Sequence, residues 1–380
     1  MSVALAATAL PDGLRWDAGR NRLKVLSPAL ADVVLRDPHI ITGVDRSRAG
    51  MATAMPEENA TPSITQFFEL WYTVSDNYAP FNTELRKVFT IRSADSYVDM
   101  FERMAAERAA ALPADGDLAR DYFSPFFMDS TFAMIGVPEA DWPNLTKVAK
   151  LVIHLFKQQL LGVTDYGARE QAAFAAVMRY LKDLTDRLLA EADSPFVDAA
   201  RRLSAMDRST WPIAALIGQL LMAGIEPMIV GGAIASRMVW SDPELPGLLR
   251  AGEVDAGEVA EECMRQSPPF GNVFRFVAEP CSCLGVPLEP GTIVAIDTEA
   301  VNLAESGPTA PVRGCPVRPT AVLTFGRGGH YCLGANTARR QVAAALRALV
   351  TARPGLRIDP AAVRIDTHNN LKEVRALPYS

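Results

Sequence analysis

The sequence has 380 residues, and its 38 Lys and Arg against 44 Asp and Glu give a formal net charge of −6. Proteins that bind the phosphate backbone of nucleic acids carry basic surfaces, so this balance argues against nucleic acid as a partner. Hydrophobic residues make up 49% and charged residues 22%, which excludes an intrinsically disordered chain.

The five cysteines are scattered and too few for a disulfide scaffold, so they indicate a reducing compartment. The N-terminal residues carry no basic segment followed by a long apolar core, and we expect no secretory signal. Together these features predict a cytoplasmic protein.

Near the N-terminus the pattern predicts a strand at Arg22–Val25 and a helix at 28–35. From Ser63 to about Trp240 apolar residues recur every three or four positions, which predicts a series of helices. Clear examples are 93–112, 142–161 and 166–192. The longest helix is predicted to start at Thr210 as N-cap, with Pro212 in its first turn, and to end before Ser241.

That longest helix falls in an apolar stretch, 213–240, which is long enough to cross a bilayer. Glu226 lies near the middle of the stretch, and a lone carboxylate at bilayer depth is costly unless it faces other protein. The sequence offers no second span to supply that protein. We therefore expect a helix buried in a protein core, and no membrane partner.

The pattern changes after residue 240. Short β-type runs alternate with Gly and Pro between Phe274 and Ile296, which predicts a small sheet. Residues 303–320 hold four Pro and two Gly and predict an irregular loop, and a helix returns at Ala335–Ala352. No linker separates these parts, so residues 1–380 are predicted to form a single domain.

The strongest motif is F-G-R-G-G-H-Y-C-L-G at residues 325–334. Its four glycines allow the backbone to turn tightly and to approach a flat ligand closely. Cys332 lies just before a predicted helix, whose N-terminal N–H groups favour the thiolate over the thiol. A thiolate held by amide donors suits an axial ligand of iron, where it pushes electron density onto the metal and favours O–O cleavage.

Every fixed position of F-G-x-G-x-H-x-C-x-G is present, and here the sequence resembles the cytochrome P450 superfamily in its soluble bacterial form. Glu262 and Arg265 fit the E-x-x-R of that family, Ser-Pro-Pro follows at 267–269, and 136–138 match its G-V-P. The resemblance covers nearly the whole chain. It implies the cytochrome P450 fold, mainly α with a small β region, with haem b between the long distal helix and the proximal Cys loop.

The resemblance also implies which residues bind the cofactor. Cys332 would be the axial ligand and thus the metal ligand, in a loop that begins with Phe325 and Gly326. Arg275 and His330 match the family positions that bind the haem propionates.

Residues 82–86 align with the C-helix pattern H-x-x-x-R of the family. Arg86 would pair with a propionate, although the position also suits an ordinary surface arginine. Asn82 replaces the histidine, and an amide donates a hydrogen bond without carrying charge. We therefore expect a weaker or rearranged anchor at this point.

The distal helix departs from the family pattern [A/G]-G-x-[D/E]-T. Ala223, Gly224 and Glu226 are present, but Pro227 replaces the threonine whose hydroxyl helps to deliver protons for O–O cleavage. Either Pro227 only shapes a kink that this helix already has in the family, or the reaction differs. In the second case a substrate hydroxyl or carboxylate supplies the hydrogen bond, Glu226 and ordered water relay protons, or the enzyme does not perform ordinary hydroxylation.

Three further groups of residues stay open. Cys281 and Cys283 lack partner ligands in the sequence and are expected to be structural rather than a metal site. The aromatic residues from Phe67 to Phe81 suit either a core or the wall of an apolar pocket. Arg339 and Arg340 suit either docking of an acidic ferredoxin or a solvated surface.

The resemblance implies a haem-thiolate oxidoreductase, a monooxygenase that tailors a small-molecule or peptide-derived secondary metabolite. The substrate would be free or bound to a carrier, and electrons would come from a ferredoxin and its NAD(P)H ferredoxin reductase. One alternative is a P450-type peroxygenase or a catalyst of oxidative coupling or rearrangement. Another is a non-catalytic P450-like binding module, and the intact Cys loop argues against it.

Overall fold

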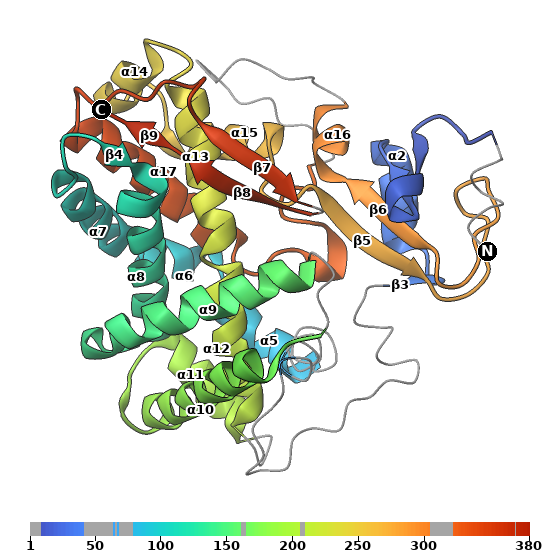
Figure 1. Cartoon of the computed structure of the whole chain (residues 1–380), viewed down its shortest axis with the longest axis horizontal. Coiled ribbons are helices and arrows are strands. Elements are labelled where there is room, and N and C mark those ends of the chain that lie inside the picture. The colour runs from blue at the N-terminus through green and yellow to red at the C-terminus, as the bar shows by residue number, and fades with distance from the viewer. Residues whose placement is uncertain are drawn as a thin grey trace. The chain divides into compact units, whose positions relative to one another are not determined.

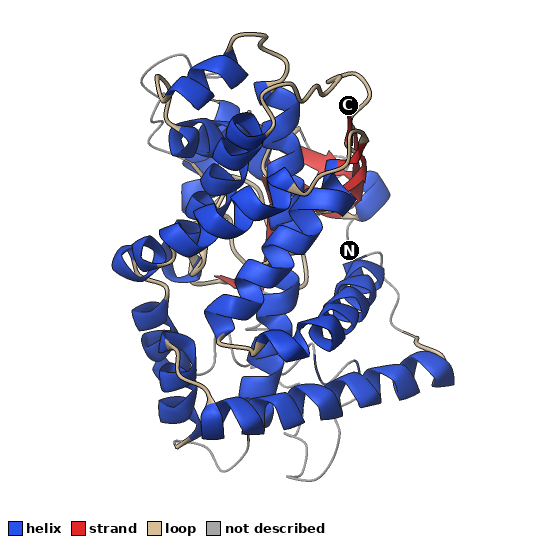
Figure 2. Cartoon of the chain, turned by 90° about the vertical axis from the view of Figure 1, so that its left-hand side faces the viewer, coloured by secondary structure: helices blue, strands red, loops and turns tan. Residues whose placement is uncertain are grey.

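The computed structural model describes residues 9–41, 64, 67, 79–160, 165–205, 210–304, 322–368 and 370–380; for 79–82, 159–160, 329 and 368 the description is of the backbone alone. These residues form mainly helices with short strands, as the sequence predicts (Figure 1, Figure 2). They divide into two compact units, one of Met1–Ala52 with Glu262–Cys332, the other of Thr53–Glu261 with Leu333–Ser380.

The first unit, the sheet unit, is built on five strands. Their order is β1 (Leu14–Asp17), β2 (Arg22–Val25), β6 (Ile293–Asp297), β5 (Asn272–Val277) and β3 (Ile40–Ile41). Only the β2–β6 pair among these is parallel, with Leu23 opposite Val294. Both side chains are fully buried, in a cluster with residues of α2 (Pro28–Arg36). The unit also contains η1 (Ala18–Arg20), α16 (Thr298–Leu303) and η4 (Gly328–His330).

The second unit, the helical unit, contains most of the helices. They are α5 (Ala79–Val88), α6 (Ile91–Ser96), α7 (Val98–Ala110), η2 (Ala119–Phe123), α8 (Ser124–Ile135), η3 (Glu139–Asp141), α9 (Trp142–Leu160), α10 (Ala168–Glu191), α11 (Pro195–Ser204), α12 (Trp211–Ala223), α13 (Glu226–Val239), α14 (Leu245–Ala251) and α17 (Ala335–Ala352). Two antiparallel strand pairs complete it, β4 (Gly116–Asp117) with β9 (Pro378–Tyr379) and β7 (Arg364–His368) with β8 (Leu371–Ala376). Helix α15 (Ala256–Gln266) leads from this unit into the sheet unit.

Aromatic rings of η2 and α8 form a central part of the core of the helical unit. Tyr122, Phe123, Phe126 and Phe127 are fully buried, and neighbouring ring centroids lie 5.1–6.2 Å apart. The Tyr122 hydroxyl donates to the backbone carbonyl of α17 at Ala345 over 2.9 Å. These contacts fix η2 and α8 against the C-terminal helix.

Local sequence patterns predict several elements closely. The strand Arg22–Val25 and the helix Ala335–Ala352 have the predicted bounds, and α9 and α10 differ from the predicted ranges by one or two residues at their ends. The prediction of one continuous helix at 93–112 is wrong. The segment is divided at Tyr97, whose N–H donates to the Ala94 carbonyl and closes α6. The irregular loop predicted at 303–320 lies outside the described residues from 305 onward.

The long helix predicted from Thr210 is two helices, α12 and α13. The Gly224 N–H donates to the Leu220 carbonyl over 2.9 Å and closes α12, while the Ile225 carbonyl accepts the first bonds of α13. Pro227 therefore lies in the first turn of α13, where its missing N–H has no intrahelical partner to lose. The cost of about 3 kcal/mol that proline imposes on a helix interior does not apply here.

Among the described residues, one helical stretch, Trp211–Val239, is long and apolar enough to span a membrane. Of its most apolar window 67% is buried inside the protein. Because a buried core helix meets the same criterion of length and composition, this stretch is weak evidence for a membrane span.

Candidate functional site

The Cys loop runs from Leu323 to Cys332 in the sheet unit. The Gly326 N–H donates to the Leu323 carbonyl over 2.9 Å, and the Cys332 N–H donates to the Phe325 carbonyl over 2.8 Å. Gly326 has a φ of +71°, and so does Gly328, a backbone region that side chains disfavour. Cys332 is exposed. The loop therefore presents one cysteine on a turn whose backbone path needs glycine.

A buried ion pair lies on α15 before this loop, as the E-x-x-R spacing implies. Arg265 donates to Glu262 through Nε and Nη2, both at 2.7 Å, and the two side chains are 3% and 1% exposed. Such a parallel pair of charge-assisted bonds fixes both orientation and distance. Gln266 Nε2 also donates to Glu262 over 2.8 Å.

Asn302 on α16 connects the ion pair to the start of the Cys loop. The backbone carbonyl of Asn302 accepts from Arg265 Nη1 over 2.7 Å. Its side-chain Nδ2 donates to the backbone carbonyl of Arg265 (3.0 Å) and to Thr324 Oγ1 (2.9 Å). Its side-chain oxygen accepts the Leu323 N–H over 2.7 Å. Sequence reasoning missed Asn302, for which the only signal is an amide in a short apolar run.

The other residues predicted to bind the cofactor in the sheet unit are Arg275 and His330. Arg275 is buried on β5, and its Nη1 donates to the backbone carbonyl of Phe274 over 2.8 Å. His330 is exposed at the end of η4. Both side chains are in the same unit as Cys332, and their roles toward a propionate stay predictions.

Arg86 is exposed on α5 in the helical unit, and the side chain of Asn82 lies outside the described part. Glu84 between them is buried and accepts from Lys87 Nζ (2.5 Å) and Arg202 Nε (2.7 Å). These hydrogen bonds lower the pKa of Glu84. Glu84 thus ties α5 to α11, and the predicted propionate contact of Arg86 is not tested by this geometry.

One face of the α12–α13 segment is open within the helical unit. From 211 to 236 the residues are buried except for five, which recur at intervals of three and four and so share one face: Gln219, Leu220, Ala223, Gly224 and Pro227. Ala223 is the most exposed of them. Three predicted site residues therefore lie on the exposed face of an otherwise buried helical segment.

Glu226, the fourth predicted residue of this segment, is buried and paired. Lys157 Nζ of α9 lies 2.5 Å from Glu226 Oε1 and 3.0 Å from Glu373 Oε1 of β8. Arg375 Nη2 holds the other oxygen of Glu373 at 2.9 Å. The sequence predicted Glu226 but neither Lys157 nor Glu373, because they are distant in sequence.

Each unit, taken by itself, offers residues whose chemistry suits a haem. The sheet unit offers an exposed thiol, the soft donor that suits haem iron, on a loop whose Gly326 and Gly328 adopt positive φ. At Gly334, which follows the loop, an added Cβ would meet nothing within 4 Å. The helical unit offers a face of small residues, Ala223 and Gly224.

Two of the open predictions can be partly resolved. Phe67 is buried, with its ring centroid 5.3 Å from that of Phe174, so it belongs to a core; Phe68 to Tyr78 lie outside the described residues. On α17 Arg339 pairs with Glu261 (3.1 Å) and Arg340 with Asp95 (2.7 Å). Docking of a ferredoxin at these arginines stays a prediction.

Comparison with known proteins gives consistent results. No family model matches the sequence. The chain is 26% identical over 359 residues to the cytochrome P450 monooxygenase PikC of Streptomyces venezuelae, covering 89% of this chain and 84% of that protein.

Two solved structures share the fold. Epothilone B-bound cytochrome P450epoK is similar with a TM-score of 0.81 at 17% identity, over 97% of this chain and 93% of that chain. P450BioI in complex with an acyl carrier protein ligated to hexadec-9Z-enoic acid has a TM-score of 0.77 at 19% identity, over 97% and 95%. The sequence similarity to PikC over most of both chains, the shared fold, the Cys loop and the buried E-x-x-R pair identify the chain as an enzyme of the cytochrome P450 superfamily, of the bacterial type.

Proposed function

We propose that this enzyme is a cytoplasmic monooxygenase that tailors a small-molecule or peptide-derived secondary metabolite. The observation that carries the proposal is the complete Cys loop with Cys332 exposed on it. Similarity to a P450 monooxygenase and to a P450 that binds epothilone B supports the reaction class and the kind of substrate. We further propose that both units together form a single P450 domain over residues 1–380.

Haem b would supply oxygen activation, with Cys332 as its thiolate ligand. Phe325 and Gly326 would shape the loop that presents this thiolate. Arg275, Arg86 and His330 would bind the propionates through charge-assisted hydrogen bonds, and Asn82 would contribute a neutral donor. Ala223, Gly224 and Pro227 would form the distal wall, where small side chains leave room.

The ion pair between the buried Glu226 and the partly exposed Lys157 is the best candidate for proton delivery in this chain. Pro227 has neither hydroxyl nor N–H, so it cannot donate a proton where the family pattern has threonine. Lys157 Nζ lies 2.5 Å from Glu226 Oε1, and a carboxyl group held in this way can act with ordered water in a proton relay. We infer that Glu226 supplies the proton to the exposed face beside it.

Replacing Glu226 with Gln is expected to lower product formation about 100-fold or more, the usual effect of removing a general acid. Reduced coenzyme would then be consumed with release of hydrogen peroxide. The matched control is Glu373→Gln, because Glu373 shares Lys157 but does not lie on α13. Equal turnover of the Glu226 and Glu373 variants would contradict the role of Glu226.

Replacing Pro227 with Thr is expected to leave product formation and peroxide release within about twofold of wild type. The reason is that Glu226 and Lys157 already supply protons, so a new hydroxyl adds a redundant route. The measurement is the ratio of product to coenzyme consumed. A manyfold gain in this ratio would show that the missing hydroxyl limits the reaction.

The substrate class can be found by titrating the purified ferric enzyme with aromatic metabolites, small peptides and carrier-bound amino acids. A low-to-high-spin Soret shift with one class identifies the substrate. A carrier-bound substrate is in the panel because a structural neighbour is a complex with a carrier protein. Absence of any product with ferredoxin, its NAD(P)H ferredoxin reductase and the shifting ligand would contradict the monooxygenase proposal.

The lack of a hydroxyl at Pro227 favours one second candidate, a peroxygenase or a catalyst of oxidative coupling or rearrangement. A peroxygenase forms product from its substrate and hydrogen peroxide without redox partners. Comparing peroxide with the ferredoxin system on the same ligand therefore distinguishes the two functions.

A further inference from the structure

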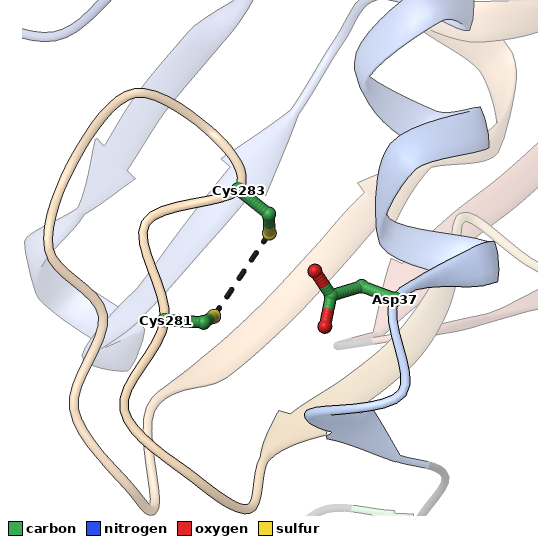
Figure 3. A group of neighbouring side chains, drawn as sticks. All are labelled: Asp37, Cys281 and Cys283. Atoms are coloured by element: carbon green, nitrogen blue, oxygen red, sulfur yellow. Dashed lines mark hydrogen bonds between the residues drawn. The ribbon is translucent and has the colours of Figure 1, made fainter.

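A cluster of two thiols and a carboxylate lies in the sheet unit, on residues that the proposed reaction does not use. Cys281 and Cys283 are on the arm between β5 and β6, and their sulfur atoms are 3.9 Å apart. Asp37 follows α2 directly, and its carboxylate points toward both sulfurs (Figure 3). The ligand atoms of the three residues all lie within 4.8 Å of one another.

Backbone hydrogen bonds fix the two cysteines on the arm. Cys281 and Leu288 exchange both of their backbone bonds, at 3.1 and 2.8 Å, which makes an antiparallel bridge. A turn then closes with the Gly285 N–H on the Ser282 carbonyl at 3.0 Å, and Gly285 has a φ of +75°. The cysteines are partly buried against the core cluster of the sheet unit, so their positions are held by packing as well.

The third group is oriented by a histidine. Asp37 Oδ1 accepts the backbone N–H of His39 over 2.8 Å and lies 3.1 Å from its Nδ1. The carboxylate is therefore held in place by His39 and points toward the two sulfurs.

The geometry suits a tetrahedral thiophilic cation. Two thiolates bound to zinc at about 2.3 Å with tetrahedral angles have sulfurs about 3.8 Å apart, close to the 3.9 Å found here. A carboxylate oxygen is a usual third ligand of zinc, and hard oxygen-seeking ions such as Mg²⁺ do not select sulfur. All three residues are partly exposed, so water has access to a fourth position.

We propose that Cys281, Cys283 and Asp37 bind one zinc ion, with His39 as the group that orients Asp37. Zinc would bind both cysteines as thiolates, so binding would release the proton of each thiol to solvent. It would join the β5–β6 arm to the end of α2, two segments far apart in sequence. The expectation that the two cysteines lack partner ligands is thereby replaced, because Asp37 comes from a distant part of the chain.

The test uses the full-length, tag-free, haem-loaded enzyme, reduced, stripped with a chelator and then given Zn²⁺ alone. Zinc retained after gel filtration is measured by elemental mass spectrometry. We expect one equivalent in wild type and in two control variants, Glu289→Gln on the same arm and Cys263→Ala in α15. We expect loss of retention in Cys281→Ser and Cys283→Ser, and affinity weaker by about 10- to 100-fold in His39→Ala.

Two readouts keep the result independent of folding. An unchanged Soret spectrum shows that zinc has not displaced Cys332 from the haem. In wild type, bound zinc is expected to protect Cys281 and Cys283 from alkylation relative to the zinc-free enzyme, as mapped by peptide mass spectrometry. Retention of zinc by the serine variants, no retention by wild type, or a Cys281–Cys283 disulfide that persists under the reducing conditions and excludes zinc would each overturn the proposal.

Discussion

Replacing Cys332 with Ser is expected to abolish the thiolate signature of the ferrous carbon monoxide complex and to lower product formation to the level of free haem. The reason is that a serine hydroxyl stays protonated at neutral pH, whereas a cysteine on this loop can be a thiolate. Without that anionic ligand the electron donation that favours O–O cleavage is lost.

The fold of the Cys332→Ser protein is expected to persist. Cys332 is exposed in the loop, and a surface substitution of this size changes the free energy of unfolding by about 0.5 kcal/mol or less in the haem-free protein. Cys263→Ala is the matched control: burial raises the pKa of the Cys263 thiol to about 12, so this thiol stays neutral and distinct from the ligand. If the Cys332→Ser enzyme kept its biological activity, a non-catalytic binding module would become the better account of the chain.

Features set by neighbours in sequence were predicted well. The strand Arg22–Val25 and the helix Ala335–Ala352 follow from local alternation and periodicity, and the turn chemistry of the Cys loop follows from its glycine positions. The break between α12 and α13 was harder to predict. At Gly224, which ends α12, an added Cβ would lie only 2.7 Å from the carbonyl oxygen of Leu220 in the same helix, so the backbone there favours glycine.

Partners that come from distant segments could not be predicted from the sequence. The E-x-x-R motif names Glu262 and Arg265, but nothing in it names Asn302, which carries the contact onward to the loop. Likewise the acid at 226 is visible in the motif, while its ammonium partner on α9 is fixed only by tertiary packing. Motifs therefore indicated the candidate site residues, and the structure supplied the residues that contact them.

The buried pair on α15 gives the largest expected effect on stability. Arg265→Met removes one member of an ion pair whose side chains are 3% and 1% exposed, and takes two charge-assisted hydrogen bonds from the buried Glu262 carboxylate. Breaking a buried pair in this way costs about 3–5 kcal/mol. The bond from Arg265 to the Asn302 carbonyl is also lost, so the start of the Cys loop loosens and haem retention falls with stability.

The measurement is the urea midpoint followed by circular dichroism, together with the haem content after purification. Arg250→Met on α14 is the control. That arginine is exposed, so its replacement is expected to change the free energy of unfolding by about 0.5 kcal/mol or less. Adding Glu262→Leu to Arg265→Met is expected to recover much of the loss, because the double variant no longer buries a carboxylate that has lost both of its hydrogen bonds from Arg265. A single variant as stable as Arg250→Met would mean that the ion pair does not hold the loop, and that Asn302 alone positions Leu323 and Thr324 before Cys332.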